Sequence, residues 1–377
     1  MKIFSKIADY IRECDKIFMI LCAFTSLYGC MAVMSATRYK GGYDDFITQL
    51  AAFLLGLGVA VVISLLDFST FIKYWYIAAA VGLIPVILTF FIGYAPPGTD
   101  DKAWLYIFGV SVQPSEFLKV MFLVTFAAHL EAIKDGINRI KVLIPVCIHA
   151  AIPVLLIHFQ GDDGTALVFG VMALGMMYAA GLKIRYLLMA LGAALVASPF
   201  VYFFVMNDDQ RSRIISILSG QTDIQNAGYQ QYRGSVALAN GGWFGQGFLK
   251  GSLTQVAGVP EGYNDFIFVT IGEELGFFGC LAVILLLGGI CLRILQTGKK
   301  CSKKSGTYIC IGVFSMLLTH IVINIGMCLS ILPVIGITLP FFSAGGTSIL
   351  ALYMCAGLIM SVYMHRNSRT LYLRDDY

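Results

Sequence analysis

The feature that most constrains this chain is a series of mostly apolar stretches, each close to 20 residues long. A helix of about 20 residues crosses about 30 Å of hydrocarbon, so each stretch is long enough to span a membrane. Seven stretches are almost wholly apolar: 17–36, 47–66, 74–94, 141–158, 186–206, 307–330 and 346–364. Three comparable stretches, 115–133, 164–181 and 265–292, carry a few polar residues. The pattern predicts an all-α integral membrane protein, a polytopic bundle of about ten transmembrane helices.

Composition excludes the soluble classes. Apolar residues make up 58% of the 377 and charged residues only 13%, and the mean hydropathy is +0.80. The ten cysteines are scattered without a C-x-x-C pair, which favours small reduced residues over a disulfide or zinc framework. The net charge of +4 does not indicate nucleic-acid binding, because basic residues in a membrane protein first report its topology.

The basic residues predict that both termini lie in the cytoplasm and that the number of spans is even. On this orientation, most basic residues fall on the inside: Lys2, Lys6, Arg12, Lys16, Lys73, Lys134, Arg139, Lys141, Lys183, Arg185, the loop 293–304 and the tail 366–374. Only Arg38, Lys40 and Lys102 lie in the short outer loops. The charged N-terminus is too long for a signal peptide, and both tails are short, so residues 1–377 are expected to form a single transmembrane domain.

The largest predicted outer loop, about 207–264, lies between helices 7 and 8 and is polar and rich in glycine. Loops of this length are usually functional or partly ordered, and residues 229–239 have the periodicity of a short interfacial helix. The glycines at 241, 242, 245, 247 and 251 indicate turns held against a surface. A second outer segment, 98–117, is too polar and too short to span and is expected to dip into the interface.

Several polar residues fall within the spans. Glu116 and Lys119 are three residues apart on a helix that Pro114 opens, so they share a face. A charge facing lipid is costly, so either a structural ion pair between packed helices or a functional pair fits. Asp162 and Asp163 open another span. The histidines in or beside the spans are expected to be hydrogen-bonded packing residues, and no metal site is predicted from them.

The stretch GVPEGYNDFIFVTIGEELGF (258–277) concentrates four carboxylates, Glu261, Asp265, Glu273 and Glu274. Asp265 stands where the outer loop meets a span, which fits a helix cap beside Asn264 or a single base at the membrane surface. Glu273 lies about 12 Å further along the helix, and Glu274 faces roughly the opposite side. No pair has the spacing of about 5–9.5 Å that a two-carboxylate glycosidase needs.

A further outer motif, GITLPFFSAGGTS (336–348), precedes the last span. Gly345 and Gly346 place exposed amide groups at a helix N-terminus, which suits an anion such as pyrophosphate. An ordinary glycine- and serine-rich helix start fits the same residues.

Taken together, these segments resemble the SEDS family (shape, elongation, division and sporulation: RodA, FtsW and SpoVE). The motifs that carry the resemblance occur in one order over about 100–365: Trp104, QPSEFLK (113–119), QGDDGTA (160–166), GYQ (228–230), GGWFGQG (241–247), PEGYNDFIFVTIGEELGF (260–277), NIGM (324–327), LPVIGI (332–337) and LPFFSAGGTS (339–348). Departures include Tyr263-Asn264, where the family usually has His-Thr before the aspartate.

The resemblance implies a ten-helix glycosyltransferase that polymerises lipid II into peptidoglycan strands on the outer face of the bacterial cytoplasmic membrane. The strands would serve cell shape and elongation, division or sporulation. The resemblance also implies a class B penicillin-binding protein as partner. The essential aspartate of the family motif falls on Asp265, the functional tryptophan on Trp104, and the membrane Glu/Lys pair on Glu116 and Lys119.

The chemistry that follows is an inverting displacement, with Asp265 as the general base for the acceptor hydroxyl. The leaving polyprenyl pyrophosphate needs positive charge. The residues predicted to bind substrate are Trp104, Glu116, Lys119, Asp162, Arg211, Arg213, Arg233, Lys250, Ser343, Gly345 and Gly346. A divalent cation, Mg²⁺ or Mn²⁺, would suit the same role, although the sequence shows no site for one.

Two alternatives belong to other classes. A lipid II flippase needs polar residues through the bilayer and often repeated halves, whereas here the polar residues cluster at one face. A non-enzymatic scaffold of the wall-synthesis machinery would use the large outer loop but would not need a carboxylate at the interface. Purified protein with lipid II separates the three: glycan strands indicate the enzyme, transbilayer movement without strands the flippase, and neither the scaffold.

Overall fold

The computed structural model describes residues 12–95, 101–107, 109–133, 136–206, 208, 210–212, 215 and 228–366. Within these ranges the chain forms ten helices of 17 residues or more. They are α2 (Lys16–Thr37), α3 (Asp44–Leu65), α5 (Trp75–Ile92), α6 (Pro114–Ala132), α7 (Ile140–Phe159), α8 (Asp163–Ala179), α9 (Ile184–Phe200), α12 (Ile267–Lys300), α13 (Lys304–Cys328) and α14 (Gly346–Met364).

Eight of these helices are long and apolar enough to cross a membrane. The other two are α8, which is apolar but shorter, and α6, which carries Glu116, Lys119 and Glu131. The predicted all-α bundle of about ten membrane helices is confirmed. The short elements are η1 (Arg38–Lys40), α4 (Phe68–Lys73), η2 (Val201–Val205), α11 (Tyr229–Gly241) and η3 (Thr254–Val256).

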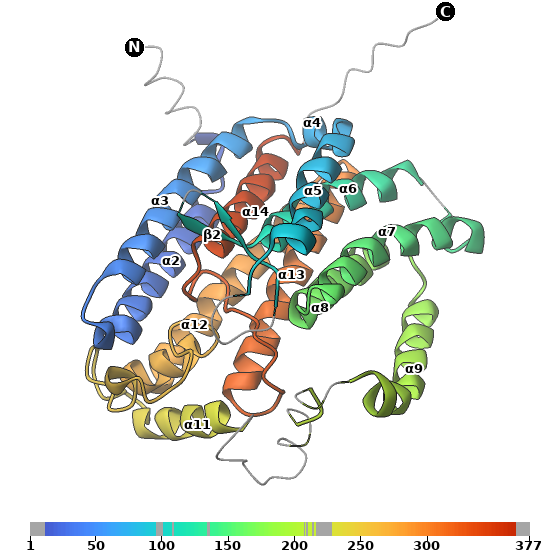
Figure 1. The fold of residues 1–377 in the computed structure, drawn as a ribbon. Helices are drawn as coiled ribbons and strands as arrows, with labels where there is room; N and C mark the ends of the chain where they lie inside the picture. Colours follow the sequence, from blue (N-terminus) through green and yellow to red (C-terminus); the bar gives the residue numbers. More distant parts are fainter. Residues whose placement is uncertain are drawn as a thin grey trace, which may run out of the picture.

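Small residues allow the central helices to approach closely. A Cβ on Gly56 of α3 would lie 2.9 Å from the side chain of Tyr353 of α14, and a Cβ on Gly357 would lie 2.9 Å from the Cα of Ala60. Because lipid offers no hydrophobic drive for helix association, such close contacts supply the packing energy. They fix α14 in the interior, against α3, while α9 stands at the edge of the bundle (Figure 1).

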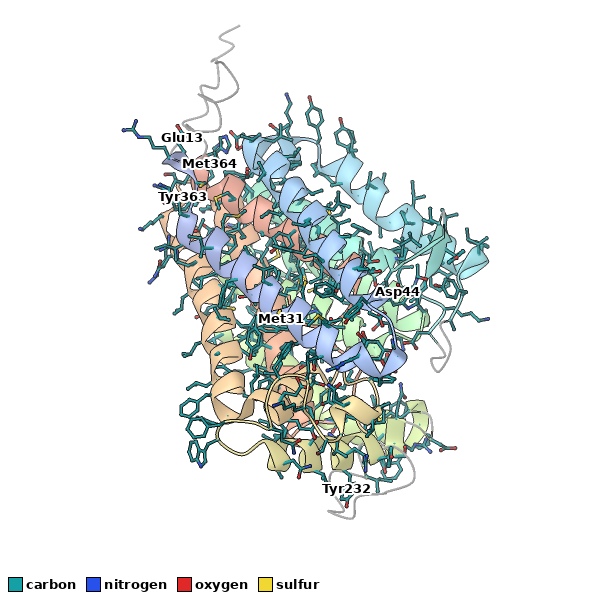
Figure 2. The ribbon with its side chains drawn as sticks, turned by 90° about the vertical axis from the view of Figure 1, so that its left-hand side faces the viewer. Glu13, Met31, Asp44, Tyr232, Tyr363 and Met364 are labelled. Atoms are coloured by element: carbon teal, nitrogen blue, oxygen red, sulfur yellow. The ribbon has the colours of Figure 1, made fainter. Side chains whose placement is uncertain are left out.

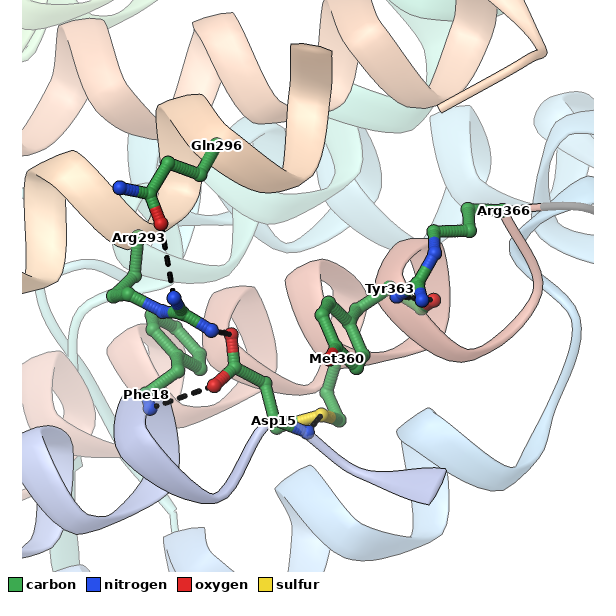
Figure 3. Close-up of polar contacts among 7 residues, drawn as sticks. All are labelled: Asp15, Phe18, Arg293, Gln296, Met360, Tyr363 and Arg366. Carbon is green, nitrogen blue, oxygen red and sulfur yellow. Dashed lines mark hydrogen bonds and ion pairs between the residues drawn. The ribbon is translucent and has the colours of Figure 1, made fainter. Parts of the chain in front are cut away.

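The two ends of the bundle differ. The start of α2 and the end of α14 lie at one end, the terminal end (Figure 1), and Figure 2 shows Glu13 and Met364 there and Tyr232 of α11 at the other end. At the terminal end, Asp15 accepts from the backbone N–H of Phe18 at 3.1 Å and forms an ion pair of 2.5 Å with Arg293. The backbone N–H of Asp15 also contacts Met360 Sδ at 3.2 Å. This contact set joins α2, α12 and α14 (Figure 3).

The segment 98–117 contains, in its described part, an antiparallel hairpin that the sequence did not reveal. Its strands are β1 (Leu105–Ile107) and β2 (Val110–Val112), with Tyr106 opposite Ser111. Trp104 bridges Tyr94 just before the hairpin. Two strands of three residues are too short for alternation to reveal them in the sequence.

The described part of the large outer loop is ordered around α12. Residues 229–241 form α11, as predicted, and positive φ angles at Gly242, Gly245 and Gly247 turn the chain back. α12 is interrupted at Gly276, whose φ of 67° and ψ of −161° are not helical. There the N–H groups of Gln246 and Gly247 donate to the carbonyls of Glu273 and Glu274, at 3.0 and 2.9 Å. The predicted glycine turns are therefore held against the interrupted helix.

Candidate active site

Asp265 lies in the turn that leads from the outer loop into α12. Its backbone carbonyl accepts from Asn324 Nδ2 of α13 at 2.8 Å and from Cys328 Sγ at 3.6 Å. The N-cap of α12 is Phe266, without a side-chain cap hydrogen bond. The helix-cap interpretation of Asp265 is therefore wrong, because the backbone of Asp265 is held by α13 and its carboxylate is left for another role.

The Asp265 carboxylate is partly buried and has no hydrogen-bond donor among the described residues. Loss of hydration, and then repulsion from Glu261 and Asp162, raise its pKa from the ordinary 3.8 to about 7. A carboxyl group with a pKa near neutrality is suited to accept a proton from a bound hydroxyl.

The segment before α14 closes around the turn that carries Asp265. Ser343 Oγ donates to the carbonyl of Asn264 at 2.8 Å and accepts from the N–H of Leu339 at 2.7 Å. The N–H of Ala344 donates to the carbonyl of Tyr263 at 2.9 Å. Ser343 is thus part of the frame of the site, bonded to backbone that adjoins Asp265.

Gln49 of α3 clamps the same segment from the other side. Its Nε2 donates to the carbonyl of Ser343 at 2.9 Å, and its Oε1 accepts from the N–H of Gly345 at 3.0 Å. The Gly345 amide predicted to face an anion is therefore already bonded. Gly346 begins α14, with Gly345 as its N-cap and no side-chain cap bond.

Glu116 and Lys119 form the predicted pair on one face of α6. Lys119 Nζ lies 2.8 Å from Glu116 Oε1, and both side chains are buried. Lys119 Nζ also lies 3.4 Å from His320 Nε2 of α13. The pair lines a small pocket together with His320, Thr338, Pro340, Ser348 and apolar residues of α6, α13 and α14.

Asp162 interacts electrostatically with this pair and with Asp265. It is the N-cap of α8 and accepts from the N–H of Thr165 at 2.8 Å. Its other oxygen accepts from Gln113 Nε2 at 3.0 Å. Burial raises its pKa, while Thr165 and the Lys119 charge lower it. The structure thus brings Asp162, Asp265, Glu116 and Lys119 into one electrostatic group.

The other predicted basic residues that the structure describes bind backbone carbonyls or are exposed. Arg211 donates to the carbonyls of Tyr202 and Phe203 in η2, the short element that follows α9. Arg233 Nε of α11 donates to the carbonyl of Gly258 at 2.6 Å, which ties α11 to the stretch before Asp265. Lys250 is exposed in the glycine-rich segment, and Arg213 lies outside the described residues.

Glu273 and Glu274 are buried, and their carboxylates accept hydrogen bonds from the outer loop. Glu273 accepts from the N–H groups of Leu253 and Thr254, both at 2.8 Å. Glu274 accepts from Ser35 Oγ of α2 at 2.6 Å and from Gln255 Nε2 at 2.9 Å. Although predicted to face opposite sides of a helix, both carboxylates bind residues 249–255, because this segment wraps around the break in α12.

Three residues of the site were not predicted: Gln49, Asn324 and His320. Each is a polar side chain inside an apolar span, which is itself a signal of a functional or structural bond. Most of their partners are backbone carbonyls and amides of segments distant in the chain, and sequence spacing does not reveal such pairings. Within the described ranges, no group of three or more His, Cys, Asp or Glu side chains lies together as a metal site.

The chain is similar to known proteins over most of its length. The model of the FtsW/RodA/SpoVE family, described as cell cycle protein, matches residues 13–368. A probable peptidoglycan glycosyltransferase FtsW of Geobacter sulfurreducens is 29% identical over 338 residues, which cover 89% of this chain and 90% of the relative. The peptidoglycan glycosyltransferase MrdB of Escherichia coli is 28% identical over 365 residues, 93% of this chain and 94% of the relative.

A solved structure described as a peptidoglycan synthase complex that coordinates polymerization and crosslinking is similar over most of the chain. It superimposes with a TM-score of 0.81 at 25% identity, covering 94% of this chain and 99% of the solved chain.

Proposed function

The chain belongs to the FtsW/RodA/SpoVE family of cell cycle proteins, and we propose that it is an inverting peptidoglycan glycosyltransferase that polymerises lipid II. The observation that carries this function is the Asp265 carboxylate. Its backbone is held by α13, it lies at the end of the bundle opposite the termini, and it has no donor among the described residues. The family relatives are named peptidoglycan glycosyltransferases.

In the proposed reaction, the 4-hydroxyl oxygen of the acceptor sugar attacks the anomeric carbon of the donor. Asp265 takes the hydroxyl proton as the new C–O bond forms. The bond from the anomeric carbon to the pyrophosphate oxygen breaks, and the electron pair leaves with the polyprenyl pyrophosphate. One displacement converts the α-linkage of the donor into the β-1,4 linkage of the strand, so a single base suffices.

The leaving pyrophosphate requires positive charge where its own charge develops. Lys119 is the best placed of the predicted cations, because it lies in the electrostatic group that includes Asp162, and its pocket is lined by residues of the segment before α14. Arg211 and Arg233 are already bonded to backbone carbonyls. The proposal therefore assigns the leaving group to Lys119.

The protein is a multi-pass membrane protein, and we place its termini in the bacterial cytoplasm and the Asp265 end outside. Basic residues concentrate at the terminal end, which supports this orientation. We also propose a class B penicillin-binding protein as partner, since the similar solved complex couples polymerization with crosslinking.

The test is strand synthesis from labelled lipid II by purified protein in liposomes, with Asp265→Ala as control. Polymer from the wild type alone supports the enzyme. Transbilayer movement of lipid II without polymer would instead identify a flippase, and neither activity would identify a scaffold. Adding EDTA to the same assay tests Mg²⁺ or Mn²⁺, since a loss of polymer that added cation restores would assign a divalent ion to the pyrophosphate.

A further inference from the structure

His320 is a polar residue at the centre of the pocket that the proposed mechanism does not use. It lies on α13 and is only 8% exposed. One ring nitrogen, Nδ1, lies 3.0 Å from the carbonyl oxygen of Thr338, and the other, Nε2, lies 3.4 Å from Lys119 Nζ. The imidazole therefore bridges α6 and the segment before α14.

The two partners define the protonation of the ring. A carbonyl oxygen only accepts, so Nδ1 carries a proton and donates to Thr338. An ammonium only donates, so Nε2 carries a lone pair and accepts from Lys119. His320 is thus a neutral imidazole that presents an acceptor to the ammonium group.

This acceptor determines how the ammonium group of Lys119 is oriented. The ammonium has three N–H groups, of which one meets Glu116 Oε1 at 2.8 Å and a second faces His320 Nε2. With both neighbours in place, the remaining N–H is directed away from them, and Lys119 lines the pocket that Thr338 and Ser348 also line. Without His320, the ammonium would be free to turn wholly towards Glu116, whose charge would neutralise it.

We propose that His320 is a positioning residue that holds Lys119 for the pyrophosphate of the leaving lipid. The inference rests on the proposed function, and His320 acts on the leaving group only through Lys119. Its effect is expected in the transition state, when negative charge grows on the leaving oxygen, so kcat changes more than KM.

Two amide substitutions separate the two bonds of His320. In His320→Gln, the amide lies near the position of Nε2, so its oxygen is able to accept from Lys119. In His320→Asn, the shorter amide lies near the position of Nδ1, so it is able to donate to Thr338 but does not reach Lys119. Both variants are polar and no larger than histidine, which suits the buried site.

The experiment measures strand synthesis from lipid II, with melting temperatures to verify folding. We expect His320→Gln to keep at least half of the wild-type kcat and His320→Asn to lose about tenfold or more, with KM changed by less than about threefold. In a Lys119→Met background, His320→Asn is expected to cause no further loss. His129→Asn provides the matched control, because His129 pairs with His149 outside the pocket, and it should behave as wild type.

The reverse order, with His320→Asn active and His320→Gln inactive, would assign His320 to holding Thr338 and overturn the proposal. Equal activity of the two folded variants, high or low, would also overturn it. If the wild type itself makes no strands, the proposed function fails. Wild-type synthesis with an inactive, folded His320→Gln counts against this inference alone.

Discussion

Asp265 and the pair Glu273–Glu274 are carboxylates of one 20-residue stretch, yet their surroundings are opposite. Glu273 has four donors within 3.1 Å, two of them backbone N–H groups. Glu274 is met by Ser35, Gln255 and two backbone N–H groups. The carboxylate of Asp265, eight residues before Glu273, has none among the described residues.

The difference shows that carboxylates of one stretch take different roles according to the number of hydrogen-bond donors around them. A buried carboxylate whose oxygens each accept hydrogen bonds from several donors holds the chain together. One that has lost its hydration without gaining donors keeps a high affinity for a proton. The structure therefore separates Asp265, the proposed base, from Glu273 and Glu274, which hold the loop, although all three lie in one short stretch.

The largest expected effect comes from removing the base. Asp265→Asn is nearly isosteric but has no basic oxygen of comparable proton affinity, so strand synthesis should fall by about 10³-fold or more. Because the carboxylate makes no hydrogen bond within the described residues, the melting temperature should not fall. Full activity in a folded variant would show that Asp265 is not the base.

The next largest effect tests the other member of the comparison, the structural role of Glu273. In Glu273→Gln, one oxygen becomes an NH₂ group. Since the two oxygens accept from Leu253 N–H and Thr254 N–H respectively, either orientation sets donor against donor. The free energy of unfolding should fall by about 3 kcal/mol, measured as a lower melting temperature in detergent.

Glu261→Gln is the matched control for that stability loss, because Glu261 is exposed in the same stretch. Its melting temperature should stay at the wild-type value. A smaller loss in Glu273→Gln than in this control would refute the structural assignment of Glu273.

The pH profile sharpens the comparison further. With the pKa of Asp265 at about 7, the rate should drop about tenfold for each pH unit well below 7, as the base becomes protonated. In Glu261→Gln, the acid limb should move to lower pH, because repulsion from Glu261 helps to raise that pKa. An unmoved limb would mean that another group controls the profile.

The same pKa affects stability with a definite sign. It is higher in the folded than in the unfolded chain, so the folded state binds more protons between about pH 4 and 7, and stability from Asp265 falls as pH rises across this range. Asp265→Asn should remove that component from the pH dependence of the melting temperature. A component that persists in the variant belongs to other residues.

The smallest effect is expected at the terminal end, where a third kind of carboxylate is paired with a cation. Asp15→Asn keeps the acceptor for Phe18 N–H but loses the charge opposite Arg293, which is partly exposed. Stability should fall by about 1 kcal/mol, with strand synthesis unchanged. A large loss of activity would couple the two ends of the bundle.

The membrane helices were predictable because length and hydropathy alone specify them. The prediction of 17–36 matches α2, and that of 346–364 matches α14 to the residue. The spacing of Glu116 and Lys119 likewise predicted their ion pair. These features depend on local periodicity, which the chain displays directly.

What the sequence did not reveal depends on contacts between distant segments. Gln49 meets Gly345 across 296 positions, and Asn324 joins the carbonyls of Asp265 and Ile337. Backbone carbonyls have no side-chain identity, so no residue pattern marks them as partners. The break at Gly276 was missed for the same reason, because backbone hydrogen bonds between residues 242–247 and α12 hold it.

That break has a consequence for how the protein is made. While α12 enters the membrane, Glu273 and Glu274 need donors at once, because unpaired carboxylates are costly there. Their donors in residues 249–255 precede them in the chain, and Ser35 precedes them by far more. Synthesis from the N-terminus therefore delivers every donor before its acceptor appears. The order of the segments along the gene is itself part of what lets this acidic helix be inserted.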